Sequence, residues 1–344
     1  MRVALTADPE LPVPPVLYGG IERIIDILAR GLAAKGHEVT LFAHPASRTA
    51  GDLVPWTGAA SDSHIDTLRN SITLARRVYA GRYDLIHSFS RIAYMLPILP
   101  FSIPKLMTYQ RPIARRSVEL GHRLSAGTLW FSAVSKQMMK GLQDVGTWRL
   151  VYNGVPLSSY TFRAMAAPDA PLVFLGRIEE VKGPHLAIEI ARLSGRPLVI
   201  AGNVASEHKA WFDVHVGPHI DQKTIRYIGP VDDAAKNELL SGAAALLMPI
   251  LWEEPFGIVM AEALACGTPV IGFARGAVPE VIEDGITGFI GEGVRALANA
   301  VARIPEIDRR ACRKRAGDFF SDSAVVDAYV SIYGEMIAAR KKQR

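Results

Sequence analysis

The stretch Glu253–Leu264, with the sequence EEPFGIVMAEAL, places two carboxylates, Glu254 and Glu262, eight positions apart across a Pro-Phe-Gly turn. An apolar segment of helical character follows Gly257, and the sequence Cys266–Pro269 ends it. A glutamate in an apolar setting requires a partner, because burying an unpaired carboxylate costs free energy. The hydroxyl groups of a bound sugar would supply such a partner.

Short apolar runs alternate with longer segments of helical periodicity on both sides of this stretch. A first set of predicted strands comprises Val3–Ala7, Val39–Ala43, Leu85–His87, Lys105–Tyr109 and Leu129–Val134, and a second set comprises Leu172–Leu175, Leu198–Ala201, Ile225–Ile228, Ala244–Pro249 and Val270–Phe273. Strands that alternate with helices indicate a parallel sheet covered on both faces. We therefore expect two doubly wound, Rossmann-like α/β domains in series.

The length of 344 residues also suggests two domains. Residues 158–171 are rich in Ala, Pro and Ser and lack periodicity, so they are the predicted linker. The first domain is then 1–160 and the second 161–322, with the C-terminal helix of residues 323–344 crossing back onto the first. Ligands of such sheets bind beyond the carboxyl ends of the strands, which predicts a site in a deep cleft between the domains.

The composition is that of a globular protein, with 49% apolar and 21% charged residues. Two cysteines, Cys266 and Cys312, form no disulfide framework and fit a reducing compartment. The chain starts directly with a predicted strand rather than a secretory signal. Its longest apolar runs reach about half of the roughly 20 residues that a membrane span needs. These features predict a cytoplasmic protein.

The positive charge is concentrated in the first part of the chain. Residues 1–155 hold 18 basic and 11 acidic residues, whereas the remainder holds 21 and 23. A basic first domain suits an anionic partner such as phosphate or a lipid surface, which suggests peripheral contact with the cytoplasmic membrane face; a solvated basic surface is the alternative. The cluster Arg111, Arg115, Arg116 and Arg123 lacks interleaved aromatic residues, so no nucleic acid is expected as a partner.

Residues Gly176–Gly183, GRIEEVKG, follow a predicted strand and open a helix. Arg177 and Lys182 would flank the start of that helix. A planar guanidinium, an ammonium and a helix dipole together favour a diphosphate. The alternative is a solvated turn in which Arg177 pairs with Glu179 or Glu180.

Several other patterns narrow the class of function. The pair Gly19-Gly20 precedes the first helix, where backbone can approach a ligand closely. No G-x-G-x-x-G follows the first strand, which argues against a dinucleotide-dependent oxidoreductase. His87 ends a strand that should point at the cleft. The sequence contains no Asp-x-Asp and no close His/Cys cluster, so we expect no metal and no cofactor.

Taken together, these residues resemble the family 4 glycosyltransferases, a retaining group with the GT-B fold. The resemblance covers nearly the whole chain and rests on segments in the family's order: Gly19-Gly20, Gly36–Thr40, Ser132–Ser135, Asn153–Val155, Gly176-Arg177 with Lys182-Gly183, and Glu254–Gly257 with Glu262-Ala263. It implies transfer of a hexose from a UDP- or GDP-sugar to an acceptor hydroxyl of a sugar, a lipid-linked compound or a small molecule.

The resemblance also implies roles for individual residues. Arg177 and Lys182 would hold the donor diphosphate, Glu254 the transferred sugar and Glu262 the ribose. The implied catalytic residues are Glu254, Arg177, Lys182 and His87, and the implied donor-binding residues are Gly20, Arg177, Lys182, Val231, Glu254, Gly257, Ile258, Val259 and Glu262. The leaving phosphate would help to deprotonate the acceptor during front-face attack.

One segment departs from the family pattern. Many members carry D-x-x-H-x-H after the fourth strand, whereas this chain has His87 in the first histidine position and Phe89 in the second. Gln110 also replaces a common histidine. These changes leave two alternatives open: a nucleotide-sugar-binding protein without transfer activity, and a GT-B-type sugar-nucleotide epimerase.

Overall fold

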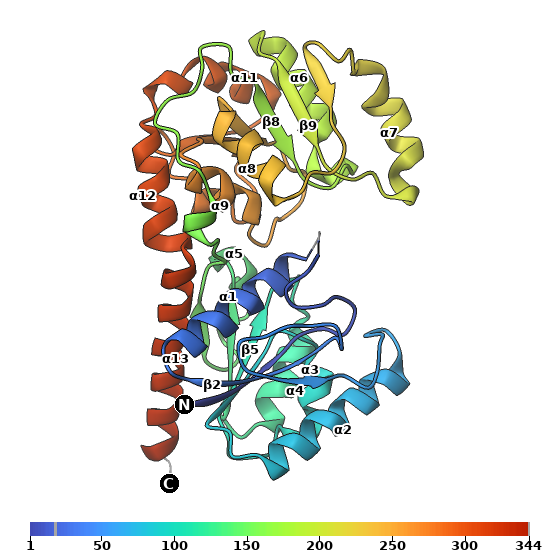
Figure 1. The fold of residues 1–344 in the computed structure, drawn as a ribbon, viewed down its shortest axis with the longest axis vertical. Helices are drawn as coiled ribbons and strands as arrows, with labels where there is room; N and C mark the ends of the chain where they lie inside the picture. Colours follow the sequence, from blue (N-terminus) through green and yellow to red (C-terminus); the bar gives the residue numbers. More distant parts are fainter. Residues whose placement is uncertain (17–18, 343–344) are drawn as a thin grey trace. The chain divides into compact units, whose positions relative to one another are not determined.

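The computed structural model describes residues 1–16 and 19–342, which form two compact units (Figure 1). Unit 1 contains residues 1–153 and the C-terminal helix from Asp322 onward, and unit 2 contains Gly154–Ser321. Each unit is a parallel sheet with helices, so the prediction of two Rossmann-like domains is confirmed.

The sheet of unit 1 has seven strands in the order β3-β2-β1-β4-β5-β6-β7. Their bounds are β1 Arg2–Thr6, β2 Glu38–Ala43, β3 Asp52–Pro55, β4 Leu85–Ser88, β5 Lys105–Tyr109, β6 Leu129–Ala133 and β7 Trp148–Leu150. All the pairings are parallel, with Leu5 opposite both Leu41 and His87. The order of strands reverses at β1 and β4, which marks the crevice where such sheets bind ligands.

The helices of unit 1 bury their apolar faces on this sheet. They are α1 Gly20–Ala34, α2 His64–Ala80, α3 Ile92–Met95, α4 Arg115–Leu124, α5 Lys136–Met139 and α13 Asp322–Lys342. In α1, the helical spacing of Ile24, Ile25, Leu28 and Leu32 forms a fully buried stripe.

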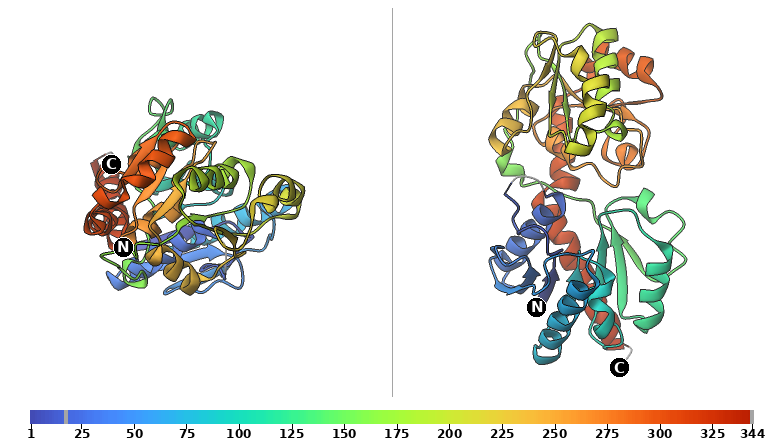
Figure 2. Two further views of the ribbon diagram at one scale, coloured as in Figure 1. Left: turned by 90° about the horizontal axis from the view of Figure 1, so that it is seen from above. Right: turned by 90° about the vertical axis from the view of Figure 1, so that its right-hand side faces the viewer.

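Helix α13 lies beside α1 in the views of Figures 1 and 2. Gly31 permits this close approach, since a Cβ atom there would lie 2.3 Å from a methyl group of Val326. Two tyrosines of α13, Tyr329 and Tyr333, are buried in unit 1. The C-terminal helix is therefore part of the core of unit 1 rather than an appendage.

The sheet of unit 2 has six strands in the order β10-β9-β8-β11-β12-β13. Their bounds are β8 Leu172–Leu175, β9 Leu198–Ala201, β10 Ile225–Tyr227, β11 Ala245–Met248, β12 Val270–Phe273 and β13 Gly288–Gly291. The helices are α6 Pro184–Ser194, α7 Lys209–His215, α8 Asp233–Gly242, α9 Ile258–Ala265, α10 Val278–Val281, α11 Val294–Ala302 and α12 Arg309–Phe320. Here the reversal in strand order falls at β8 and β11.

The chain passes from unit 1 to unit 2 between Asn153 and Gly154, earlier than the predicted linker. The segment after this point is fixed to unit 2 because Arg313 donates hydrogen bonds to the carbonyl oxygens of Leu157 and Tyr160. Val155 also forms a bridge with Ser321. These contacts place residues 154–160 in unit 2, whereas the predicted boundary put them in the first domain.

Short strands at the sheet edges escaped the sequence prediction. β3, β7 and β13 each lie at an edge of their sheet and have only three or four residues, and β13 contains two glycines.

Within the described parts of the chain, no helix has the length and apolar character needed to cross a membrane.

Candidate active site

The predicted donor-binding residues of unit 2 gather at the carboxyl ends of β8 and β11. Arg177 and Lys182 follow β8 directly, and Glu254 follows β11. These two strands are neighbours and mark the reversal in strand order. The sheet therefore brings together residues that are far apart in the sequence, at the edge where doubly wound sheets bind ligands.

Two glycines let the loops at this edge pack without side chains. Gly183 has a positive φ of 76°, and a Cβ atom there would lie 2.1 Å from the carbonyl oxygen of Pro249. Gly276 has a φ of 55°, and its Cβ atom would lie 2.2 Å from the backbone nitrogen of Glu254. Only glycine fits these positions, because both the backbone conformation and the space exclude a side chain. The backbones that carry Lys182 and Glu254 are thereby fixed.

Glu254 is held by a lysine and a tryptophan. The Nζ atom of Lys182 and the Nε1 atom of Trp252 lie 2.5 Å and 2.9 Å from the same carboxylate oxygen, Oε2. The Lys182 ammonium also lies 4.6 Å from the centre of the Trp252 ring. Only 10% of the Glu254 side chain is exposed. The lysine and the tryptophan both contact Oε2, which leaves acceptor capacity on Oε1.

Arg177 lies close to this pair in sequence and is half exposed. Its guanidinium forms an ion pair with Glu179 at 2.9 Å, as one interpretation of the sequence expected. Because 46% of the Arg177 side chain remains exposed, the pairing does not prevent it from meeting a ligand. Glu179 itself is buried, with 9% of its side chain exposed, so only the arginine side of the pair faces solvent.

Helix α9 begins at the predicted turn. Gly257 caps it in the left-handed region, with φ of 72° and ψ of 70°. Ile258 and Val259 form the first turn and are partly exposed. The first N–H groups of a helix have no partner within the helix, so this end attracts an anion.

Glu262 lies inside α9 and is held in the same manner as Glu254. Its Oε1 atom accepts hydrogen bonds from the Lys236 ammonium at 2.5 Å and the Tyr160 hydroxyl at 2.8 Å. The side chains of Lys236 and Glu262 are 12% and 6% exposed. Each buried glutamate is thus bound through one oxygen by a lysine and an aromatic side chain.

The sequence prediction missed these supporting residues. Trp252 stands two positions before Glu254, so its proximity was visible in the sequence. Lys236 and Tyr160 come from distant segments, and neither follows a recognisable spacing from Glu262.

Val231 lies beyond the carboxyl end of β10, at the same edge of the sheet. The preceding Gly229 accepts a hydrogen bond from the backbone N–H of Gly202, which follows β9. Val231 is partly exposed. Val231 therefore lies on the β10 side of the reversal in strand order, and its predicted part in donor binding stays a prediction.

In unit 1, Gly20 starts α1 and His87 lies in β4. A Cβ atom on Gly20 would meet no atom within 4 Å, so the backbone there is open to a ligand. His87 instead is fully buried, and its two ring nitrogens lie 2.6 Å from the Tyr333 and Thr108 hydroxyls. Burial holds the pKa of His87 well below its usual value. The structure therefore gives His87 a place in the core, under α13, rather than a position for catalysis.

The two residues that depart from the family pattern also have internal contacts. The Phe89 ring lies 4.2 Å from the His87 ring, centre to centre, and is buried. Gln110 and Asn153 exchange two hydrogen bonds of 2.7 Å. Phe89 thus extends the aromatic packing around His87.

Asp8 is a further carboxylate that the sequence prediction did not select. It follows β1 at the switch point of unit 1, with a side chain 12% exposed and Arg111 at 3.8 Å. Its Oδ1 atom is buried and has no hydrogen-bond partner within the described residues. Burial raises the pKa of Asp8 to about 6, against the effect of Arg111. A carboxylate kept at such a cost marks a candidate ligand contact.

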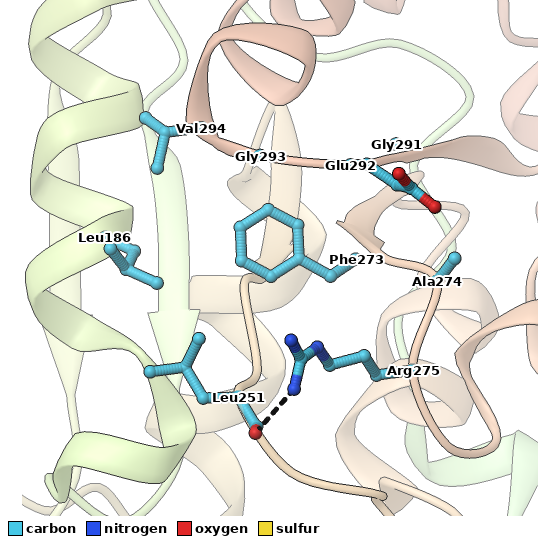
Figure 3. A pocket seen from close by; sticks show the side chains of 9 residues that line it. All are labelled: Leu186, Leu251, Phe273, Ala274, Arg275, Gly291, Glu292, Gly293 and Val294. Atoms are coloured by element: carbon cyan, nitrogen blue, oxygen red, sulfur yellow. Dashed lines mark hydrogen bonds between the residues drawn. The ribbon is translucent and has the colours of Figure 1, made fainter.

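An apolar pocket of about 490 Å³ lies farther along the sheet of unit 2, at the carboxyl ends of β12 and β13. Figure 3 shows the Phe273 ring at its centre and Arg275 donating a hydrogen bond to the Leu251 carbonyl oxygen. The lining residues are Leu186, Leu251, Phe273, Ala274, Arg275, Gly291, Glu292, Gly293 and Val294. They differ from the predicted site residues.

In residues 1–16 and 19–342, no group of three His, Cys, Asp or Glu side chains is placed to hold a metal ion.

Two doubly wound parallel-sheet units in one chain form an architecture of the GT-B type. Residues 166–318 match the family described as Glycosyl transferases group 1, and residues 18–159 match Glycosyltransferase Family 4. The chain belongs to family 4 of the glycosyltransferases and is an enzyme of that class.

Glycogen synthase of Mycobacterium tuberculosis (strain ATCC 25618 / H37Rv) is 27% identical over 397 residues, which covers 96% of this chain and 94% of the relative. Sucrose-phosphate synthase from Thermosynechococcus elongatus has a TM-score of 0.82 at 19% identity, over 98% of this chain and 99% of that one. HepE of Anabaena, solved in complex with UDP-glucose, has a TM-score of 0.73 at 16% identity, over 97% and 100%. At these identities the solved structures establish the shared fold.

We predict that Asp8→Asn stabilises the protein at neutral pH. The folded-state pKa of Asp8, about 6, lies above its ordinary value of 3.8, so the folded state binds the proton more tightly and loses stability as the pH rises from about 4 to 6. The difference between these two pKa values corresponds to about 3 kcal/mol in the free energy of unfolding. Thermal unfolding at pH 4.5 and pH 7.5 should show a gain in melting temperature for Asp8→Asn that is larger at pH 7.5. The exposed Asp62→Asn serves as control, and an equal effect of Asp8→Asn at both pH values would contradict the prediction.

Proposed function

We propose that this enzyme is a retaining, metal-independent glycosyltransferase that moves a hexose from a UDP- or GDP-linked sugar to an acceptor hydroxyl. The observation that carries the proposal is the pair of lysine-bound glutamates, Glu254 and Glu262, on either side of the start of α9. The complex of the Anabaena neighbour with UDP-glucose supports a nucleotide-sugar donor.

The donor diphosphate would bind beside the start of α9. Lys182, Arg177 and the N–H groups of Gly257, Ile258 and Val259 supply positive charge and hydrogen-bond donors in one place. These groups are set before the reaction, so they stabilise the charge on the departing diphosphate without rearranging solvent. In this proposal they take the role that a divalent cation has in other transferases.

Glu254 would bind the hydroxyls of the transferred hexose through Oε1, while Oε2 stays bound to Lys182 and Trp252. The bond between the anomeric carbon and the phosphate oxygen breaks, and the acceptor oxygen forms its bond on the same face. The acceptor proton passes to the leaving phosphate. The charge on Glu254 favours the oxocarbenium-like sugar between these events.

The proposal is tested by measuring the donor turnover of the wild type and of Glu254→Gln. EDTA is present to remove divalent cations, because the proposed reaction needs none. Wild-type enzyme should release UDP or GDP from its donor sugar, slowly by hydrolysis and faster with an acceptor. Loss of hydrogen bonds to a charged group costs about 1.5–3 kcal/mol, so Glu254→Gln should reduce turnover by about 10- to 150-fold. Nucleoside-diphosphate affinity should change by less than about threefold, because the hexose contact is absent.

The neighbouring Glu253→Gln is the matched control, since Glu253 is exposed and accepts its hydrogen bond from the N–H of Gly276. A wild-type enzyme that binds a donor yet consumes none with any acceptor would favour a nucleotide-sugar-binding protein. Conversion of the donor sugar without release of the nucleotide would favour an epimerase.

As part of this proposal, unit 1 contacts an anionic lipid surface that presents the acceptor. Helix α2 exposes Ile65 by 65%, Leu68 by 60% and Ile72 by 40%, at helical spacing. Arg69 and Arg76 are exposed on the same helix. Apolar side chains flanked by arginines are typical of helices that lie in the headgroup region of a bilayer.

We predict that the protein sediments with vesicles containing phosphatidylglycerol at low salt and that Leu68→Glu removes most of this binding. Leu193→Glu, at a leucine of unit 2 that is 55% exposed, should leave it unchanged. High salt should weaken binding because the electrostatic attraction is screened. Equal sedimentation of the wild type and Leu68→Glu would reject α2 as the contact.

A further inference from the structure

Two side chains from separate segments hold Glu262. Lys236 comes from α8, and Tyr160 comes from the segment that follows the passage into unit 2. Both donate to Oε1 of Glu262, at 2.5 Å and 2.8 Å, and the Lys236 ammonium lies 5.9 Å from the centre of the Tyr160 ring. The carboxylate plane is thereby fixed from two directions.

The electrostatic surroundings keep the Lys236 side chain charged. Burial by itself would lower the pKa of Lys236, but the carboxylates of Glu262 and Asp233 outweigh burial and raise it. Asp233 lies 3.1 Å from the ammonium. Burial, together with the nearby Glu262, raises the pKa of the Cys266 thiol to about 12, so this neighbour stays neutral. The Lys236 ammonium therefore keeps its proton beside the Glu262 carboxylate.

This arrangement determines which oxygen a ligand can use. Each oxygen of an ionised carboxylate accepts about two hydrogen bonds. Lys236 and Tyr160 already provide two donors to Oε1. The remaining capacity lies on Oε2, which is enough for the two adjacent hydroxyls of a ribose.

We propose that Lys236 and Tyr160 are positioning residues that fix Glu262 to accept hydrogen bonds from the 2′- and 3′-hydroxyls of the donor ribose, and so make the enzyme select ribonucleotides over deoxyribonucleotides. This inference rests on the proposed nucleoside-diphosphate donor. In this role the two residues affect which nucleotide binds. A purely structural contact between α8 and α9 would have no such effect. A site built to bind a hydroxyl rejects the analogue that lacks it, because its polar group is then left unpaired.

The test is isothermal titration calorimetry of UDP and GDP and of their 2′-deoxy analogues. Wild-type enzyme should bind the ribonucleotide at least about tenfold more tightly than its 2′-deoxy form, since one hydrogen bond to a charged group is lost. Lys236→Met should reduce this ratio of affinities to less than about threefold, mainly because it weakens the binding of the ribonucleotide. Lys236→Arg should restore most of the ratio, because it returns a cation to Oε1.

Tyr160→Phe provides a second variant that keeps the ion pair, in case Lys236→Met fails to fold, and it should lower the ratio severalfold. Lys209→Met is the matched control, because Lys209 forms an exposed ion pair with Asp213 on α7 and should leave the ratio unchanged. If folded Lys236→Met and Tyr160→Phe keep the wild-type ratio, the positioning role is overturned, and the pair only braces the helices. If the wild type binds neither nucleotide, the proposed donor itself fails.

Discussion

The candidate active site at the edge of the sheet of unit 2 depends on the pairing of buried carboxylates with lysines. Glu254 and Glu262 are each about nine-tenths buried or more, and each has its ammonium partner at 2.5 Å. Removing one partner of such a pair typically costs about 3–5 kcal/mol, because it leaves a buried charge without compensation. A pair of this kind contributes little net stability compared with apolar packing. Its presence at a ligand-binding edge is better explained by function.

The sheet supplies the geometry that makes these pairs possible. β8 and β11 are adjacent in the sheet although about 70 residues of sequence separate them, so the loops that carry Lys182 and Glu254 meet at one edge. Gly183 and Gly276 permit the close backbone packing that holds both loops. Helix α9 then begins between the two glutamates and presents its N–H groups to the same space. Charge, dipole and hydrogen-bond acceptors thus converge at one edge of the sheet.

The positions of several candidate site residues in the fold could be predicted from the sequence. Residues that belong to one continuous motif, such as Glu254 and Glu262 or Arg177 and Lys182, were selected because their spacing fixes their relation to a strand and a helix. Lys236 and Tyr160 were missed, since only the folded chain brings α8 and the segment after Gly154 to Glu262. The central strands of both sheets were predictable because buried strands have continuous apolar sequences. The edge strands β3, β7 and β13 lack such sequences and were not predicted.

His87 is a residue whose surroundings the sequence did not predict. Its place near the end of β4 suggested a side chain that reaches a ligand, but the register of the strand directs it to the face covered by α13, where Tyr333 and Thr108 satisfy both ring nitrogens. The sequence predicted that the C-terminal helix returns to the first domain, but it did not show that this helix covers His87. Asp8, which follows the neighbouring strand β1, is one of the buried polar groups of unit 1 that have an atom without a hydrogen-bond partner among the described residues.

The decisive measurement is a crystal structure with a bound UDP- or GDP-hexose. The diphosphate should lie at the start of α9 against Lys182 and Arg177. Glu254 Oε1 should be within hydrogen-bond distance of a hexose hydroxyl, and Glu262 Oε2 should be within reach of the ribose. A donor bound elsewhere in unit 2, for example in the pocket around Phe273, with the contacts of both glutamates unchanged and no ligand atom near them, would contradict it.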